Sequence, residues 1–247
     1  MLGYDNNYLL NKRIKIYQPK GFYHASTDAV WLAASVTKVK KGDSVLDVGS
    51  GTGAVSLCLA HRFAGKQINI TGLEIQAELV EASQQSAKAN NFDFLQFARI
   101  NILQQKYKPC SFNHVITNPP YYEDNMPSPN LSKAAAHNLS KEDFHHWLDF
   151  CLKALKPQGR FYMINRVEML EDIISGLRNR LGAVEIFPIF SKPNDVKAKR
   201  VIVRAQKDCK TPTIIRAPIY THTVESKHSI LSEKVLRQGL SIDQSIG

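Results

Sequence analysis

From residue 43 onward, short apolar runs alternate with segments of helical periodicity, and this alternation restricts the possible folds more than any other feature. The helical patterns lie at 54–63, 77–90, 143–155 and 167–181. The strand-like runs lie at 44–48, 67–73, 97–100, 114–117, 160–165, 184–189 and 200–205. This β–α rhythm predicts an α/β fold with a mostly parallel sheet and helices on both faces.

The last two strand-like runs are joined by a short segment, SKPNDVKAKR, that has no helical pattern. Parallel neighbours need a longer crossover, so these two runs are predicted to form an antiparallel hairpin at the edge of a seven-stranded sheet. We expect residues 1–40 to form an N-terminal segment, 41–207 the sheet domain and 208–247 a C-terminal extension. Within the extension, 230–236 could form one short helix.

The composition favours a globular protein with a polyanionic partner. The chain has 247 residues, of which 43% are hydrophobic, and 32 Lys and Arg against 22 Asp and Glu give a net charge of +10. This charge indicates nucleic acid first, and a membrane surface second, as the partner. Basic residues gather at Lys12, Arg13, Lys15 and Lys20, and again between residues 192 and 216.

The sequence indicates neither a membrane span nor a metal site. Apolar runs are too short to cross a bilayer, and the N-terminus lacks the apolar region of a signal peptide. The four cysteines lie far apart without a C-x-x-C pair, so no zinc site or disulfide framework is predicted. His145 and His146 have no neighbouring Cys or Asp ligand pattern, and Trp147 beside them is interpreted as a core or interface residue. We expect a cytoplasmic chain without a metal or an obligate protein partner.

A glycine-rich turn, LDVGSGTG at 46–53, joins the first sheet strand to the first helical pattern. Gly49, Gly51 and Gly53 allow the backbone to pass close to a ligand, and the helix that follows offers free N–H groups. Glu74 ends the next strand, where an acidic side chain can accept hydrogen bonds from ribose hydroxyls. Together these features predict a nucleoside-containing cofactor.

The turn alone leaves the cofactor open. Gly49, Gly51 and Ala54 also fit the G-x-G-x-x-A pattern of dinucleotide-binding proteins, so a NAD-dependent oxidoreductase is an alternative. Asp47 favours S-adenosylmethionine, because a carboxylate is awkward beside a pyrophosphate but suits a cationic amino-acid end. The G-x-G-x-G spacing and the position of Asn118 favour the same cofactor.

Asn118-Pro119-Pro120-Tyr121 follows the strand-like run 114–117. Two prolines stop the ladder and stiffen the backbone, although an Asn-Pro pair alone can also simply begin a turn. The Asn118 amide oxygen and the Pro119 carbonyl could accept hydrogens from an –NH₂ group, while the Tyr121 ring covers its face. At the end of the fourth strand, this tetrapeptide would lie beside the cofactor and hold an amine that receives a methyl group.

The segments STDAVWLAA (26–34), LDVGSGTGAVSLCLA, GLE and ITNPPYY carry a resemblance to class I S-adenosylmethionine-dependent methyltransferases with an NPPY motif, over about residues 20–205. More narrowly, the chain resembles the bacterial tRNA adenine-N6 methyltransferases that act on a valine tRNA. The resemblance implies a Rossmann-like fold, S-adenosylmethionine as cofactor, and methyl transfer to the N6 amine of an adenine in RNA. Residues 1–40 would then contribute to the cofactor and RNA sites.

The resemblance also assigns residues to the site. Asp47 and the glycine turn would hold the methionine part of the cofactor, Glu74 its ribose, and Asn101 would face its adenine, where many relatives have Asp. The catalytic set is Asn118, Pro119, Pro120 and Tyr121. The cofactor-binding set is Thr27, Asp28, Asp47, Gly49, Ser50, Gly51, Gly53, Glu74, Ile75, Asn101, Ile102 and Asn118.

Other acceptors and other functions remain open at this point. NPPY also serves enzymes that methylate a protein glutamine amide or a guanine amine in rRNA. Glutamine methyltransferases usually carry an additional helical N-terminal domain, whereas only about 40 residues precede the first sheet strand here. A non-catalytic RNA-binding protein on the same fold is a further alternative.

Overall fold

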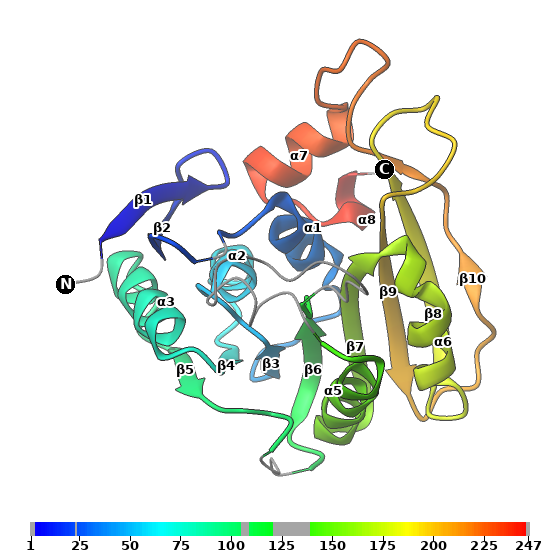
Figure 1. Cartoon of the computed structure of the whole chain (residues 1–247), viewed down its shortest axis with the longest axis horizontal. Coiled ribbons are helices and arrows are strands. Elements are labelled where there is room, and N and C mark those ends of the chain that lie inside the picture. The colour runs from blue at the N-terminus through cyan, green and yellow to red at the C-terminus, as the bar shows by residue number, and fades with distance from the viewer. Residues whose placement is uncertain (1–2, 23, 105–108, 121–138, 246–247) are drawn as a thin grey trace.

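A single large sheet forms the centre of the computed structural model, which describes residues 3–22, 24–104, 109–120 and 139–245. Its strands are β3 (Ser44–Val48), β4 (Asn69–Glu74), β5 (Leu95–Arg99), β6 (Phe112–Thr117), β7 (Leu155–Arg166), β8 (Leu181–Phe190), β9 (Arg200–Lys207), β10 (Ile214–Ile215) and β11 (Ile219–Tyr220). The strand order is β10–β8–β9–β7–β6–β3–β4–β5 (Figure 1). Strand β11 also pairs with β8. Strands β7, β6, β3, β4 and β5 run parallel, whereas β9 is antiparallel to both of its neighbours.

The mostly parallel sheet and the antiparallel β8–β9 hairpin confirm the predicted fold class, but the predicted number of seven strands was wrong. The described part of the sheet has nine strands. Strands β3 to β9 are the seven that were predicted, and the C-terminal extension adds β10 and β11, which pair in parallel with β8. Each of these strands has only two residues, too few for a periodic pattern to reveal.

Helices α2 (Ala54–Arg62), α3 (Ala77–Ala89) and α5 (Lys141–Ala154) lie close to their predicted ranges. Helix α5 begins at a capping box, in which the Ser140 side chain accepts from the Asp143 N–H and the Asp143 carboxylate reaches back. The predicted helix 167–181 is shorter, with a 3₁₀ turn (Val167–Met169) before α6 (Leu170–Leu177). It ends early because Arg178 has an extended ψ of 133° and Asn179 a left-handed φ of 60°, and a right-handed helix admits neither.

The N-terminal residues form elements that no strong sequence pattern predicted. Strands β1 (Tyr4–Leu9) and β2 (Ile14–Pro19) pair as a separate antiparallel hairpin, and α1 (Thr27–Ser35) follows it. The Asn90 side chain, at the end of α3, accepts from the Lys15 N–H at 2.9 Å and donates to the Lys15 carbonyl. The backbone of the hairpin is therefore bonded to a side chain at the end of α3.

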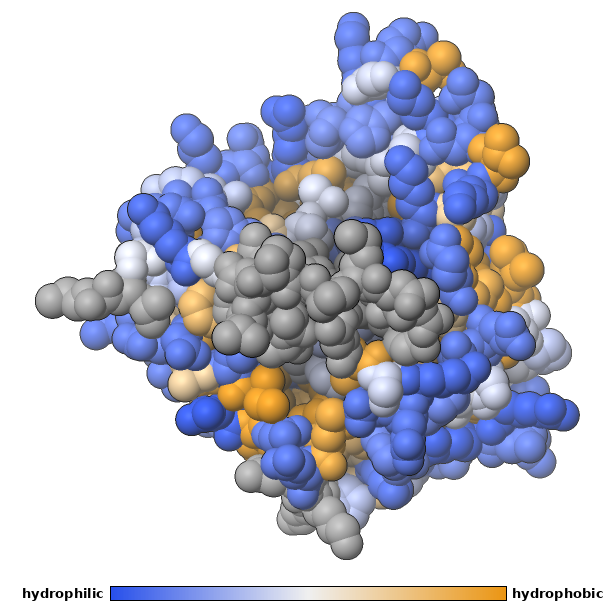
Figure 2. All heavy atoms as spheres, viewed as in Figure 1, coloured by the Kyte–Doolittle hydropathy of each residue, from blue (hydrophilic) through white to orange (hydrophobic). Residues whose placement is uncertain are grey.

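Two hydrophobic clusters occupy the two faces of the sheet. Neighbouring residues of β6 point to opposite faces, with Ile116 in the cluster beneath α1 and α2 and Val115 in the cluster beneath α5 and α6. Helices α7 (Ile230–Gln238) and α8 (Ile242–Ser245) pack beside α1 (Figure 1). Hydrophilic residues cover most of the face seen in Figure 2. In the described residues, no helix is both long and apolar enough to cross a membrane.

Strands β3, β4, β5 and β6 run parallel, so their carboxyl ends meet along one edge of the sheet. The glycine turn follows β3, Glu74 ends β4, Asn101 follows β5 and Asn118 follows β6. In open α/β sheets, ligands bind in the crevice outside the carboxyl ends of the strands.

Candidate active site

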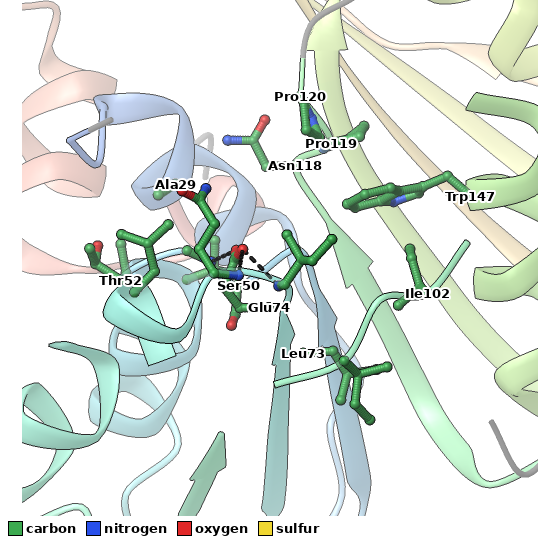
Figure 3. A pocket seen from close by; sticks show the side chains of 18 of the residues that line it. Ala29, Ser50, Thr52, Leu73, Glu74, Ile102, Asn118, Pro119, Pro120 and Trp147 are labelled. Atoms are coloured by element: carbon green, nitrogen blue, oxygen red, sulfur yellow. Dashed lines mark hydrogen bonds between the residues drawn. The ribbon is translucent and has the colours of Figure 1, made fainter. Parts of the chain in front are cut away.

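A cavity of about 210 Å³ lies at this edge of the sheet (Figure 3). Its wall is built from the loops after β3, β4, β5 and β6, from the first turns of α1, α2 and α3, and from Trp147 of α5. Of the residues predicted for the site, those that line the cavity are Gly49, Ser50, Gly51, Glu74, Ile75, Asn101, Ile102, Asn118, Pro119 and Pro120. Tyr121 lies outside the described residues.

The glycine turn takes a backbone path that other residues rarely adopt. Gly49, Gly51 and Gly53 have φ values of 72°, 55° and 79°, all in the left-handed region. The Gly49 and Ser50 N–H groups both donate to the Leu73 carbonyl at 2.9 Å, which anchors the turn to β4. Gly53 does not line the cavity, and a Cβ there would lie 2.9 Å from the Phe97 ring. Gly53 therefore serves packing between α2 and β5.

Glu74 is a buried carboxylate that holds the turn in place. Its Oε2 accepts from the Gly51 N–H at 3.0 Å, and its Oε1 accepts from the N–H groups of Ile75 and Gln76 at 2.8 and 3.0 Å. Burial raises the pKa of Glu74, and the three backbone N–H groups oppose that rise. A carboxylate has about four acceptor positions, so one remains for a ligand at the cavity wall.

Asp47 was predicted to touch the cofactor, but it lies beneath the turn and does not line the cavity. Its side chain is 1% exposed, and the Ser56 hydroxyl of α2 donates to Oδ2 at 2.7 Å. Burial raises the pKa of Asp47 to about 6, although the hydrogen bonds from Ser56 oppose the rise. In the structure, Asp47 supports the base of the turn.

Thr27 and Asp28, also predicted for the cofactor site, lie outside the cavity wall. Thr27 is exposed, and the Asp28 carboxylate accepts from the Arg200 guanidinium at 2.9 Å. The N-terminal segment instead contributes Ala25, Ser26 and Ala29 to the wall. Small apolar side chains have no functional group that a sequence pattern could reveal. The prediction therefore fell on the polar residues Thr27 and Asp28.

Asn118 brings an unpaired acceptor to the cavity. Its amide Oδ1 is buried, and no donor among the described residues reaches it. Figure 3 shows Asn118 beside Pro119 and Pro120, above Ser50 and Glu74 in that view. An unsatisfied buried acceptor normally costs about 1–3 kcal/mol, so its place in a cavity wall indicates a ligand that donates a hydrogen bond.

Trp147 joins the turn to the strand that precedes Asn118, a role that the sequence did not reveal. Its ring lines the cavity, and a Cβ on Gly49 would lie only 2.7 Å from ring atom Cζ2. Its Nε1–H donates to Thr117 Oγ1 at 2.9 Å, and the Thr117 hydroxyl donates to the Val48 carbonyl at 2.9 Å. This chain of hydrogen bonds connects α5 to the ends of β6 and β3.

Apolar side chains surround the remaining mouth of the cavity. Ile75 and Leu103 line it and are 47% and 39% exposed, and Ile102 also lines it. The Asn101 Oδ1 accepts from the Leu103 N–H at 3.1 Å, so this amide oxygen shapes its own loop. Exposed apolar side chains at a cavity mouth can cover a flat ring. Among the residues that the structure describes, no group of three or more His, Cys, Asp or Glu could hold a metal ion.

The parallel sheet, the glycine turn after its first strand and the acidic side chain after its second define an α/β protein that binds a nucleoside-containing ligand at the carboxyl edge. A family model described as "Methyltransferase domain" matches residues 39–200, and the chain belongs to this family.

Named relatives and solved structures agree with that class. A tRNA1(Val) (adenine(37)-N6)-methyltransferase of Pedobacter heparinus is 26% identical over 195 residues, which cover 77% of this chain and 81% of the relative. A protein of Agrobacterium tumefaciens described as a predicted O-methyltransferase has a TM-score of 0.71 at 22% identity, covering 87% of this chain and 97% of its own. A class I S-adenosylmethionine-dependent methyltransferase of Listeria monocytogenes has a TM-score of 0.58 at 16% identity, covering 81% and 67%. At these identities the two structures indicate the fold alone.

Proposed function

We propose that this chain transfers a methyl group from S-adenosylmethionine to the exocyclic N6 amine of an adenine in tRNA. The observation that carries the proposal is the buried, unpaired Oδ1 of Asn118 in the wall of a cavity that also contains the glycine turn. The methyltransferase family and the name of the Pedobacter heparinus relative support the reaction and the substrate.

The residues of the wall fit this cofactor. Glu74 retains one acceptor position for a ribose hydroxyl, and the left-handed path of Gly49 and Gly51 leaves room for the methionine end. Ile75 and Ile102 offer apolar surface to the adenine ring. When bound, S-adenosylmethionine supplies an electrophilic methyl group on a sulfonium.

The acceptor residues orient the target amine. The lone pair of an adenine amine is delocalised into the ring, so the nitrogen is a weak nucleophile. An –NH₂ group has two hydrogens, and the Asn118 Oδ1 and the Pro119 carbonyl would each accept one of them. The lone pair would then point toward the methyl group, and orientation of this kind can lower a barrier by several kcal/mol. Trp147 holds the strand end from which Asn118 projects.

The net charge of +10 supports a polyanionic substrate. An adenine within RNA must leave its stack to enter a cavity, so a loop nucleotide of a tRNA is the preferred target. A tRNA substrate also favours a cytoplasmic location. We further propose that residues 1–40 serve the cofactor and RNA sites, that 41–207 form the catalytic domain, and that 208–247 extend the sheet.

The test is methyl transfer from labelled S-adenosylmethionine to bulk tRNA from a strain that lacks the gene. We expect label in tRNA and, after digestion to nucleosides, N6-methyladenosine by mass spectrometry. Bulk rRNA and a protein extract serve as parallel acceptors under the same conditions. Label in a guanine nucleoside or in protein glutamine, with none in tRNA, would overturn the adenine assignment. Absence of methyl transfer to any of the three acceptors would overturn the proposal that the chain is a methyltransferase acting on them.

A further inference from the structure

The N-terminal hairpin has one face packed against the protein and one face turned away from it. Ile14 and Ile16 of β2 are fully buried. The register pairs Tyr8 with Lys15, and residues paired across two antiparallel strands project on the same face. The alternation along each strand therefore gives the outer face a shared set of aromatic, amide and basic side chains. Its members are Tyr4, Asn6, Tyr8, Lys15 and Tyr17.

Contacts within this outer face order its side chains and leave one ring available. The Lys15 ammonium lies 4.7 Å from the centre of the Tyr17 ring, and the Tyr4 ring meets Tyr17 edge to face at 6.2 Å. Tyr8, opposite Lys15, has 52% of its surface exposed. Tyr17 is thus occupied within the protein, whereas Tyr8 offers an aromatic surface beside a fixed positive charge.

The backbone beneath this face is held firmly. The Tyr17 N–H donates to the Ser86 hydroxyl of α3 at 2.9 Å, in addition to the bonds between Lys15 and Asn90. At the turn of the hairpin, the Arg13 guanidinium donates to the Gln238 carbonyl at the end of α7 at 3.1 Å. The face is therefore presented as a rigid ribbon, which lowers the entropy lost when a partner binds.

The hairpin is also joined directly to the wall of the cavity. The Gln18 Oε1 of β2 accepts from the Ala25 N–H at 2.6 Å, and Ala25 lines the cavity. Asp5 pairs with Gln18 in the register and so projects on the opposite face, where it lies 4.0 Å from the Lys20 ammonium and 3.7 Å from His24. Within the described hairpin, the outer face therefore carries no acidic side chain.

We propose that the outer face of the β1–β2 hairpin binds RNA nucleotides that flank the target adenine, with a base stacked on Tyr8 and a phosphate held by Lys15. The inference rests on the proposed function, because it assumes an RNA substrate in the neighbouring cavity. Aromatic side chains stack on unpaired bases, and nearby ammonium groups contact the backbone that connects those bases. The Asn6 amide can hydrogen-bond to base edges on the same face.

The test compares the full chain with a Tyr8→Ala/Lys15→Gln variant, using bulk tRNA from the strain without the gene. We expect tRNA affinity, measured by filter binding, to fall about 20-fold, because stacking on one base and one phosphate contact are lost. Affinity for S-adenosylmethionine by calorimetry and the rate of methyl transfer at saturating tRNA should not change. Lys15→Gln alone should reduce the slope of log affinity against log salt by about 1.

Two controls separate stacking from general effects. Tyr8→Phe keeps the ring and should bind tRNA like the wild type. Val224→Ala/Lys227→Gln removes an exposed apolar side chain and a lysine from the loop between β11 and α7, outside the basic stretch 192–216, and should also leave tRNA binding unchanged. Thermal unfolding midpoints establish that each variant folds.

The outcomes distinguish this inference from the proposed function. If the wild type methylates tRNA and the Tyr8→Ala/Lys15→Gln variant binds tRNA equally well, the hairpin inference is wrong and the proposed function stands. A loss of tRNA affinity in Tyr8→Phe as large as that in Tyr8→Ala/Lys15→Gln would overturn the stacking role of the ring. If the wild type neither binds nor methylates tRNA, both inferences fail.

Discussion

The Glu74 carboxylate and the Asn118 amide, on the two halves of the cavity wall, differ in how their oxygens are paired. On the half that we assign to the cofactor, Glu74 accepts three backbone N–H groups and the turn is bonded to the Leu73 carbonyl. On the half that we assign to the target amine, the buried Asn118 Oδ1 has no partner among the described residues. The backbone of the turn is thus fixed before any ligand arrives, although the buried Ser50 hydroxyl there has no partner among the described residues, whereas the Asn118 Oδ1 gains a hydrogen bond only when its ligand binds. The two halves should therefore respond differently to substitution.

The largest expected effect is that of Asn118→Ala. Loss of the acceptor should lower the rate of methyl transfer about 1000-fold, equivalent to about 4 kcal/mol, because the amine loses its orientation. The affinity for S-adenosylmethionine should stay close to that of the wild type, since Glu74 and the turn are untouched. Single-turnover transfer and calorimetry measure the two quantities.

Asn69→Ala is the matched control, because Asn69 is an exposed asparagine at the opposite end of β4. It should leave both quantities unchanged. If Asn118→Ala instead weakened cofactor binding as much as it slowed transfer, the two halves would not be independent and the comparison would be wrong.

Gly49→Ala should have the next largest effect, and it acts on the cofactor half. Gly49 has a φ of 72°, and a Cβ there would lie 2.7 Å from the Trp147 ring. The left-handed backbone costs about 1–2 kcal/mol and the overlap adds to it, so we expect the free energy of unfolding to fall by about 3 kcal/mol. Urea denaturation measures this fall, and the affinity for S-adenosylmethionine should fall with it.

Gly51→Ala separates the two causes. Gly51 has a φ of 55°, but a Cβ there would meet no atom within 4 Å. This variant should lose only the backbone part, about 1 kcal/mol. Adding Trp147→Leu to each variant should remove the excess loss of Gly49→Ala over Gly51→Ala. An excess that persists without the Trp147 ring would show that the overlap is not its cause.

The sequence predicted those parts of the site whose residues have local signals. The glycines of the turn after β3 and the acidic end of β4 each leave a pattern within a few residues. The alternation of side chains along β3 also indicates which way Asp47 points, although Asp47 was predicted to hold the cofactor. Asp47 shares a face with Val45, toward α2, and so lies beneath the turn and not in the cavity wall.

The other parts of the wall depend on contacts between distant segments. Trp147 reaches Gly49 across almost 100 residues, and on an amphipathic helix a tryptophan of the core looks the same as one that lines a cavity. Ala25 and Ala29 are small and apolar, so their role in the cavity wall can be recognised only when the cavity itself is known. The two-residue strands β10 and β11 were missed for a similar reason, because β8 selects them by pairing.

A smaller effect, of about 2 kcal/mol, should appear in the pH dependence of Asp47→Asn. Burial raises the pKa of Asp47 to about 6, above its ordinary value of 3.8, so the folded state binds a proton more tightly than the unfolded state. The stability that Asp47 contributes is therefore full at low pH and is lost as the pH rises through about 4 to 6. Asp47→Asn cannot ionise and should lose less stability over this range.

Urea denaturation of both proteins at pH 4 and pH 7.5 measures this difference. The stability of Asp47→Asn minus that of the wild type should be larger at pH 7.5 than at pH 4. Ser56→Ala is a useful companion, because it removes a hydrogen bond that opposes the rise in pKa and should steepen the pH dependence. Parallel profiles for wild type and Asp47→Asn would show that Asp47 does not titrate in this range.

The smallest effect is expected for Trp147→Phe, which acts where the two halves meet. The substitution keeps a ring against Gly49 but removes the Nε1–H that donates to Thr117 Oγ1 at 2.9 Å. Loss of this buried hydrogen bond should cost about 1 kcal/mol of stability. Because Asn118 follows Thr117 directly, methyl transfer should slow about fivefold while cofactor affinity changes little.

A double-mutant cycle with Thr117→Val shows whether the hydrogen bond itself carries the effect. Thr117→Val removes both the acceptor for Trp147 and the donor to the Val48 carbonyl. In the Thr117→Val background, Trp147→Phe should therefore slow methyl transfer little further, a coupling of about 1 kcal/mol. Additive losses would mean that Trp147 acts through its ring on the cofactor half. Coupled losses would mean that it acts through Thr117 on Asn118, whose buried Oδ1 has no donor among the described residues.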